Sequence, residues 1–271
     1  MLSKPLGVVK YALFAVFDPA RIVSGSVTEF DRTRWRQFKR AIQLSLFYLV
    51  NLVLYAVPLT LAGFGQVGDP GESPAIVESV AAGIGIGPEL LWSYVMAFVQ
   101  NCSYLFLFSI LTFVMFHLAV WVTRSSNGYL QSINTVVYST GIYLAAIFSV
   151  TWYITMAESI VVAEEWLIWL QAEFVYTIID AVGSDLELAT GRPEPVSLAD
   201  ATRAGVSTLA LLFVSIAYYL YSLYLGAQIN HDADRTTALL TVVLVVVSPA
   251  LFVLGSVLVA LYGGVLSFTT I

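Results

Sequence analysis

The run YVMAFVQNCSYLFLFSILTFVMFHLAVWVT, residues 94–123, decides the fold class of this chain. It holds no Asp, Glu, Lys or Arg over thirty consecutive residues. As a helix it would be about 45 Å long, at about 1.5 Å per residue, which exceeds the roughly 30 Å hydrocarbon core of a bilayer. We therefore predict a membrane-spanning helix here that tilts, kinks or projects from the bilayer.

Four other runs without charge are also long enough to cross a membrane, and the complete set lies near 41–62, 94–123, 133–157, 205–228 and 237–264. The composition agrees, because 59% of the 271 residues are hydrophobic and only 11% are charged. A soluble domain holds roughly 25% charged residues. We predict an all-α fold, namely a polytopic membrane helix bundle with about five transmembrane helices plus interfacial helices.

The basic residues are divided unevenly between the segments that join these runs, and cytoplasmic loops carry the excess of Lys and Arg. If the amino terminus is inside, only Arg192 and Arg203 lie outside, and ten basic residues lie inside: Lys4, Lys10, Arg21, Arg32, Arg34, Arg36, Lys39, Arg40, Arg124 and Arg235. Thirteen of the eighteen acidic residues fall in the outer segments 63–93 and 158–204. The sequence thus predicts a multi-pass protein of the cell membrane with a cytoplasmic amino terminus and an external carboxyl terminus.

Two regions follow from this topology. Residues 1–40 are expected to form a cytoplasmic amino-terminal segment, and 41–271 a five-span membrane domain with an acidic external segment at 158–204. In the first region we expect a surface helix over 5–17, whose apolar face combines Leu6, Val9, Leu13 and Phe17. The stretch before Asp18-Pro19 is too short for a cleavable signal peptide, so none is expected.

The run 164–182 is short for a span, since only about fourteen of its residues are rich in apolar types. Trp166 and Trp169 favour a helix seated at the outer interface. A re-entrant element is the alternative. The balance of nine Arg to three Lys with a net charge of −6 suggests a salt-loving prokaryotic source.

No motif indicates an enzyme. The two histidines, His117 and His231, lie on different predicted segments, and the single cysteine, Cys102, excludes both an intramolecular disulfide and a cysteine metal cluster. No HExxH, GxSxG, glycine-rich phosphate loop or CxxC sequence occurs. We expect no catalytic, metal-binding or cofactor-binding residues, and no nucleic-acid partner, because the basic residues abut a membrane without a binding module.

Polar residues inside spans need partners because hydrocarbon offers none, and five stand out: Asn51, Gln100, Asn101, His117 and Asn134. For Asn51, Gln100 and Asn101 we expect hydrogen bonds between helices rather than a solute path. His117 shares a helical face with Arg124, seven residues later. We predict that it is neutral and hydrogen-bonded to another span, the alternative being a proton-responsive or ligand-responsive site.

The basic run RTRWRQFKR at 32–40 stands directly before the first span. Positive-inside anchoring alone explains it, and the alternative is binding of anionic lipid or a cytoplasmic partner by Arg32, Arg34, Arg36, Lys39 and Arg40. In the last span Ser256, Ala260 and Gly264 recur every four residues and predict a close-packing face. We expect this face to serve internal packing rather than a homo-oligomer.

Two stretches carry a family resemblance. FHLAVWVTRSSNGYLQSINTVVYSTGIYLAAI, 116–147, contains His117, Arg124, Gly128 and Tyr138, and YYLYSLYLGAQINHDADRTTALLTVVL, 218–244, contains Gly226, His231, Arg235 and Ala238. Together with DPARIV at 18–23, these stretches resemble the membrane domain of the Yip family (Ypt-interacting proteins), prokaryotic type. The chain departs from the family pattern after Tyr138, where Gly141-Ile142 replaces the usual proline, and it lacks the eukaryotic DLYGP motif, which argues against binding of Rab-type GTPases.

The resemblance implies a membrane scaffold or adaptor without catalytic activity, whose partners would be the bilayer, anionic lipids of the inner face and another membrane protein. The alternative hypothesis is a small-solute or proton-coupled transporter, or an accessory subunit of a larger complex. Transport would require Asn51, Gln100, Asn101 and His117 to converge on one cavity.

Overall fold

The computed structural model describes residues 14, 17–24, 34–61, 71–156, 161–187, 191–195, 197 and 203–266. Within these ranges the chain is α-helical and holds no strand, which confirms the predicted all-α fold. The expected surface helix over 5–17 lies almost entirely outside the described residues, as does Arg32.

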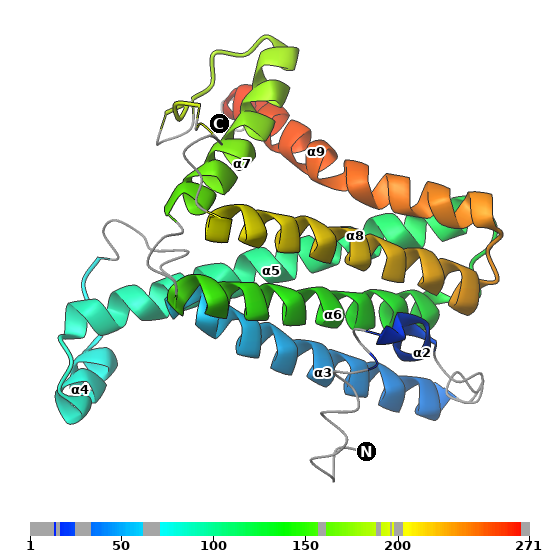
Figure 1. The fold of residues 1–271 in the computed structure, drawn as a ribbon, viewed down its shortest axis with the longest axis horizontal. Coiled ribbons are helices and arrows are strands. Elements are labelled where there is room, and N and C mark those ends of the chain that lie inside the picture. Colours follow the sequence, from blue (N-terminus) through cyan, green and yellow to red (C-terminus); the bar gives the residue numbers. More distant parts are fainter. Residues whose placement is uncertain are drawn as a thin grey trace.

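Five long helices run roughly antiparallel side by side (Figure 1): α3 (Arg34–Leu61), α5 (Pro88–Val122), α6 (Tyr129–Met156), α8 (Arg203–His231) and α9 (Arg235–Leu266). Four of them, α3, α5, α8 and α9, are long and apolar enough to cross a membrane. The protein is therefore a multi-pass membrane protein. The helix α6 packs between α3 and α8, and its role as the fifth span stays a prediction.

Most of these helices begin before the predicted spans. α3 starts at Arg34 rather than 41, and α5 at Pro88 rather than 94. Hydropathy marks only the part of a helix that lies in hydrocarbon, whereas backbone hydrogen bonding continues into the headgroup region. At Pro88 the helix follows an ordinary start signal, proline at the first position after Gly87. The basic run 34–40 is thus the first two turns of the first span and not a separate segment.

We call the end of the bundle with the loops 123–128 and 232–234 the loop end, and the opposite end the far end. The main apolar core lies at the loop end, where α5, α6, α8 and α9 meet around eight buried residues: Phe116, Val120, Val136, Leu223, Ala227, Ala233, Ala238 and Val245. A short helix, α2 (Pro19–Val23), lies against α6 and α8 at this end (Figure 1). The amino-terminal part of the chain is thereby brought to the core.

The far end carries two shorter elements. α4 (Ala75–Ile84) ends at Gly85, whose left-handed backbone turns the chain so that α4 packs against the start of α5. α7 (Val161–Val182) crosses the ends of α8 and α9 at a steep angle to the long helices (Figure 1). α7 buries Tyr176 and Ile179 against Val257 of α9. This crossing direction favours the interfacial interpretation of 164–182 over a further span.

The small-residue face of α9 does not pack inside the chain. Ser256 and Ala260 are exposed, and the buried residue of this turn is Val257. The prediction of internal packing is therefore wrong for these two positions, because an apolar partner on α7 selects the larger side chain next to them. At position 264 the structure describes the backbone alone.

Candidate functional site: a polar network at the loop end

Ser132 joins the two histidines of the chain. Its hydroxyl lies 2.9 Å from Nδ1 of His117 on α5 and 3.1 Å from Nε2 of His231 at the end of α8. Ser132 and His231 are buried, with exposed fractions of 0% and 1%. The hydrogen bond predicted between His117 and another helix of the bundle is confirmed, because Ser132 belongs to α6. The joining of two helix ends through one hydroxyl was not predicted.

The backbone N–H of Asn127 donates to Nδ1 of His231 over 3.1 Å. This contact determines which nitrogen of the His231 ring accepts a hydrogen bond and which one donates. A neutral imidazole has one donor and one acceptor, so His231 then carries its proton on Nε2 and donates to Ser132. Ser132 then keeps its own proton to donate, and Nδ1 of His117 lies 2.9 Å away. The contact with Asn127 thus assigns His231 to the Nε2–H tautomer, and donation from Ser132 would give His117 the same tautomer.

The side chain of Asn127 ties the two short loops together. Its amide Nδ2 donates to the carbonyl oxygen of Asn230 at 3.2 Å and to the carboxylate of Asp232 at 2.8 Å. The neighbouring backbone is tightly turned, with positive φ at Arg124 and at Gly128, where φ is 136°. An added Cβ at Gly128 would also lie 2.7 Å from Oε1 of Gln131, so glycine fits this position best.

The carbonyl oxygen of Val23 is the second centre of the network. α2 begins with Asp18 as N-cap, whose carboxylate accepts from the N–H of Arg21 at 3.3 Å, and ends at Val23. The last carbonyls of a helix need partners from outside the helix. Here Asn134 of α6 and Asn230 of α8 both donate to the Val23 carbonyl, at 3.0 and 2.9 Å. Two long helices therefore cap one short helix.

Close backbone contact makes this arrangement possible. Gly226 of α8 faces α6 and α2, and an added Cβ would lie 2.1 Å from Cγ2 of Thr135 and 2.9 Å from Cγ1 of Val23. Thr135 also accepts a hydrogen bond from Asn230 at 2.8 Å. Val23, Thr135 and Asn134 are completely buried. The glycine thus allows three elements to meet at van der Waals distance.

Arg40 points inward. Its guanidinium donates to Oδ1 of Asn134 over 3.1 Å and lies 6.0 Å from the ring centre of Tyr138. It is therefore part of the loop-end network, and its place in the candidate lipid-binding set stays a prediction. Helical periodicity turns position 40 away from the face of α3 that carries Arg34 and Lys39.

The other intramembrane polar residues do not converge. Asn51 donates to the carbonyl of Phe47 on its own helix, and Gln100 bonds to Tyr104, also on its own helix. Asn101 alone bridges helices, donating to Thr60 of α3 at 3.1 Å. The interhelical prediction is therefore confirmed for Asn101 and wrong for Asn51 and Gln100, whose carbonyl or hydroxyl partners lie one turn away.

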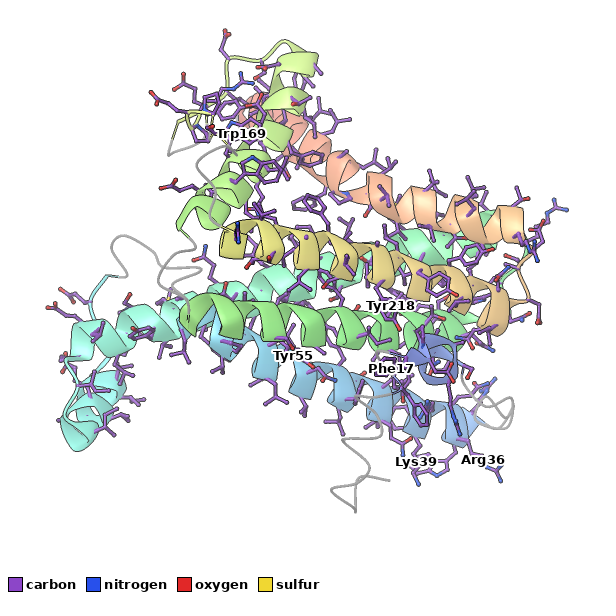
Figure 2. The ribbon with its side chains drawn as sticks, viewed as in Figure 1. Phe17, Arg36, Lys39, Tyr55, Trp169 and Tyr218 are labelled. Atoms are coloured by element: carbon purple, nitrogen blue, oxygen red, sulfur yellow. The ribbon has the colours of Figure 1, made fainter. Side chains whose placement is uncertain are left out.

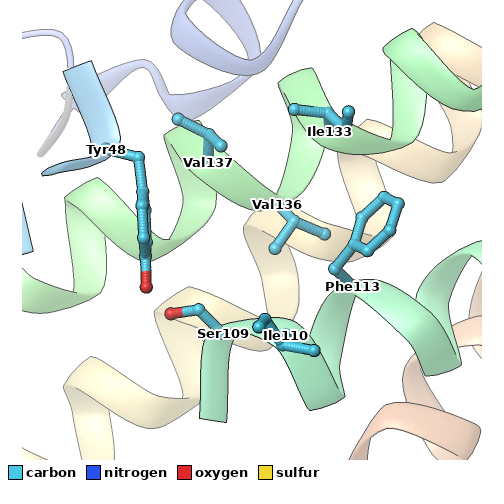
Figure 3. A pocket seen from close by; sticks show the side chains of 7 residues that line it. All are labelled: Tyr48, Ser109, Ile110, Phe113, Ile133, Val136 and Val137. Atoms are coloured by element: carbon cyan, nitrogen blue, oxygen red, sulfur yellow. The ribbon is translucent and has the colours of Figure 1, made fainter. Parts of the chain in front are cut away.

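Asn101 and His117 are sixteen positions apart on α5, which corresponds to about 24 Å along the helix. The hollow between α3, α5 and α6 has a volume of about 110 Å³ and lies between these two levels (Figure 3). Apolar side chains with Tyr48 and Ser109 line it, and none of the five predicted polar residues does. This hollow therefore does not provide the shared cavity that the transport alternative requires.

At the far end, Arg192 binds two carboxylates of α7. It donates to Glu173 and, at 3.2 Å, to Asp180, and it lies over the ring of Tyr176 at 5.1 Å. Hydrogen bonding to Arg192 holds the pKa of Glu173 below its ordinary value. The cluster fixes the segment 191–195 on α7. Among the described residues no group of three or more His, Cys, Asp or Glu side chains is arranged to hold a metal ion.

Of the residues that carry the family resemblance, several meet at the loop end. His117 and His231 share Ser132, Gly226 contacts Thr135, and the ring of Tyr138 lies tilted against that of Phe47 with ring centres 5.2 Å apart. Arg124, Gly128 and Arg235 lie in or next to the two short loops. Comparison with family models, curated proteins and solved structures finds no match for this chain.

The residues that the sequence analysis missed are Ser132, Thr135, Asn127 and Asn230. A signal for two of them was available, since Ser132, Thr135 and Ser139 repeat at three- and four-residue intervals and are completely buried. Such a stripe of small hydroxyl residues is typical of a tightly packed helix face. Asn127 and Asn230 lie in loop and helix-end contexts where an asparagine is ordinary, so spacing gave no signal.

Proposed function

We propose that the protein is a non-enzymatic membrane scaffold or adaptor of the Yip type. The observation that carries this proposal is the use of the buried polar side chains. Asn101 pairs with Thr60, and Asn134, Asn230 and His231 pair with neighbouring elements at the loop end. These contacts join helices to one another and hold α2 in place. Buried polar side chains that are used for packing in this way support a scaffold rather than a transport path.

The orientation belongs to the same proposal. Among the described basic residues, Arg21, Arg34, Arg36, Lys39, Arg124 and Arg235 lie at the loop end, whereas the acidic residues of α4 and α7 lie at the far end. Figure 2 labels Arg36 and Lys39 among the basic residues of the loop end. The positive-inside rule then supports a cytoplasmic loop end and an external far end. A prokaryotic and salt-adapted source fits the same charge balance.

In this proposal the loop end presents the partner-binding surface to the cytoplasm. α2 and the two short loops are held together by Val23, Asn127 and the histidine pair, so their relative positions are preorganised. The exposed small-residue positions Ser256 and Ala260 leave homo-oligomerisation through α9 available as an alternative use of the molecule.

The test combines purification and transport. Protein purified from its native membrane after crosslinking should retain a partner in fixed ratio, and Arg124→Gln with Arg235→Gln should reduce that ratio, whereas Glu72→Gln at the far end should not. Vesicles containing the purified protein should dissipate a pH gradient no faster than empty vesicles. A leak that is abolished by His117→Gln would overturn the scaffold proposal in favour of a proton-coupled transporter.

A further inference from the structure

The first turns of α3 stand clear of the bundle. Every residue from Arg34 to Lys39 is exposed, and the side chains of Arg36 and Lys39 point away from the other helices (Figure 2). Two of these exposed residues are large aromatics, Trp35 at 70% and Phe38 at 57%. Their ring centres lie 6.0 Å apart, so they form one apolar surface beside the charges.

Helical periodicity divides the charges of this segment between two faces. Arg34 and Lys39 flank Trp35 and Phe38 on the face that continues into Ile42, Leu46 and Leu49, all of them exposed. Arg40 lies on the other face and donates to Asn134 inside the protein. One face of α3 is thus apolar along its length and begins with an aromatic pair and two cations.

The length of α3 places this beginning at the membrane interface. Its 28 residues measure about 42 Å, which exceeds the roughly 30 Å hydrocarbon core by about two turns. Tryptophan prefers the headgroup level, and basic side chains next to it reach the phosphates. Lys39 and Arg34 then lie at the level of the lipid phosphate, and Ile42 at the level of the acyl chains.

We propose that Arg34, Trp35, Phe38 and Lys39 form a binding site for the headgroup of an anionic phospholipid. The two cations bind the phosphate, and the aromatic pair with Ile42 packs against the glycerol and upper acyl region. The occupant is a lipid because the site continues without interruption into the exposed apolar face of the span. The inference rests on the proposed function only for the assignment of this site to the inner leaflet.

The experiment uses the whole protein in vesicles of phosphatidylcholine with 20% brominated lipid, where bromine within contact distance quenches tryptophan fluorescence. The part of the signal due to Trp35 is obtained by subtraction of the variant Trp35→Phe. Brominated phosphatidylglycerol should quench Trp35 more strongly than brominated phosphatidylcholine at low salt. Removal of each cation, as Arg34→Gln or Lys39→Gln, should lower this preference about fivefold, since a cation near the surface contributes about 1 kcal/mol.

Matched variants separate a site from a general charge effect. Arg34→Lys should keep the preference, and Arg36→Gln, which removes an exposed cation from the same turns of α3 but outside the site, should leave it unchanged. Equal quenching of Trp35 by the two lipids, or an equal loss in Arg36→Gln, would overturn the inference and leave the run as a topology signal. The pH-gradient and partner assays described above are read independently, so failure of the lipid site is distinguishable from failure of the scaffold role.

Discussion

Asn134 on α6 and Asn230 on α8 donate their side-chain amides to the same acceptor, the carbonyl oxygen of Val23. The two donors come from different long helices, and the acceptor is the end of a five-residue helix that would otherwise leave its carbonyl unsatisfied. The short helix α2 is therefore held by side chains of the membrane domain rather than by its own length.

Removal of either amide should destabilise the protein. Asn230→Leu breaks the bonds to Val23 and Thr135 and leaves buried acceptors without that donor, which costs about 1–3 kcal/mol. Thermal unfolding in detergent, followed by tryptophan fluorescence, measures the loss. The control is Asn51→Leu, because the amide of Asn51 donates to the carbonyl of Phe47 on its own helix. Equal melting temperatures for the two variants would contradict the role of Val23 as a shared acceptor.

Gly226→Ala should be more damaging than its size suggests. The new methyl group would lie 2.1 Å from Thr135 and 2.9 Å from Val23, so α8 must move away from α6 and α2. Such overpacking costs about 1–3 kcal/mol. Gly255→Ala on α9 is the matched control, since nothing lies within 4 Å of its Cβ position and the higher helix propensity of alanine favours it by about 0.5–1 kcal/mol. Opposite signs for the two substitutions are the expected result of a chemical unfolding series.

The hydrogen-bond directions around Ser132 predict both histidine tautomers. His231 and His117 should each carry the proton on Nε2, because each Nδ1 accepts, one from Asn127 N–H and the other from the Ser132 hydroxyl. Nitrogen-15 chemical shifts of labelled histidine distinguish the tautomers directly. His117→Gln keeps an acceptor for Ser132 and should melt close to the unchanged protein, whereas His117→Leu should cost about 1–2 kcal/mol. An Nδ1–H signal from either ring would show that the network runs in another direction.

The fold was predictable because its signal is physical and local. A run such as 94–123 cannot be stable in hydrocarbon except as a helix, so hydropathy and length were enough. The loop-end network was not predictable to the same degree, because its acceptor is a backbone carbonyl at Val23 and its donors are 111 and 207 positions away. Side-chain type indicated that Asn134 and His117 needed partners, but only the packing of α2 against α6 and α8 identifies them. Arg40 shows the same limit of prediction from composition. It belongs to the same basic run as Arg34 and Lys39, yet it bonds to Asn134 inside the protein whereas those two residues are exposed.

The topology can be tested with single cysteines in a Cys102→Ser background. Glu72→Cys and Glu194→Cys are exposed at the far end and should react with an impermeant maleimide on intact cells. Ser126→Cys, in the loop between α5 and α6, should react only after the membrane is permeabilised. Labelling of position 126 on intact cells would invert the proposed orientation, and labelling of all three would exclude the five-span arrangement.

Acid should release the segment 191–195 from α7. The pKa of Glu173 is lowered by Arg192, so this contact contributes fully above the unfolded-state pKa of about 4.3 and is lost as the pH falls through the lower folded-state value. A fluorophore attached at Glu194→Cys should show constant anisotropy from pH 8 to 5 and a fall below about pH 4. In Glu173→Gln, where Asp180 still binds Arg192, the anisotropy at pH 8 should be lower than in the unchanged protein. A fall of the same size at the same acid pH in that variant would assign the transition to another group.

The contact between Val23 and Asn230 also has a consequence in time. During synthesis at about 5–20 residues per second, the acceptor leaves the ribosome roughly 10–40 seconds before its second donor exists. The docking of α2 therefore cannot be completed until α8 has been inserted, and this completion is among the last events of biogenesis. A chain interrupted before α8 lacks Asn230 and its hydrogen bond to Val23. In such a chain α2 would be more accessible to quality-control proteases than in the complete protein.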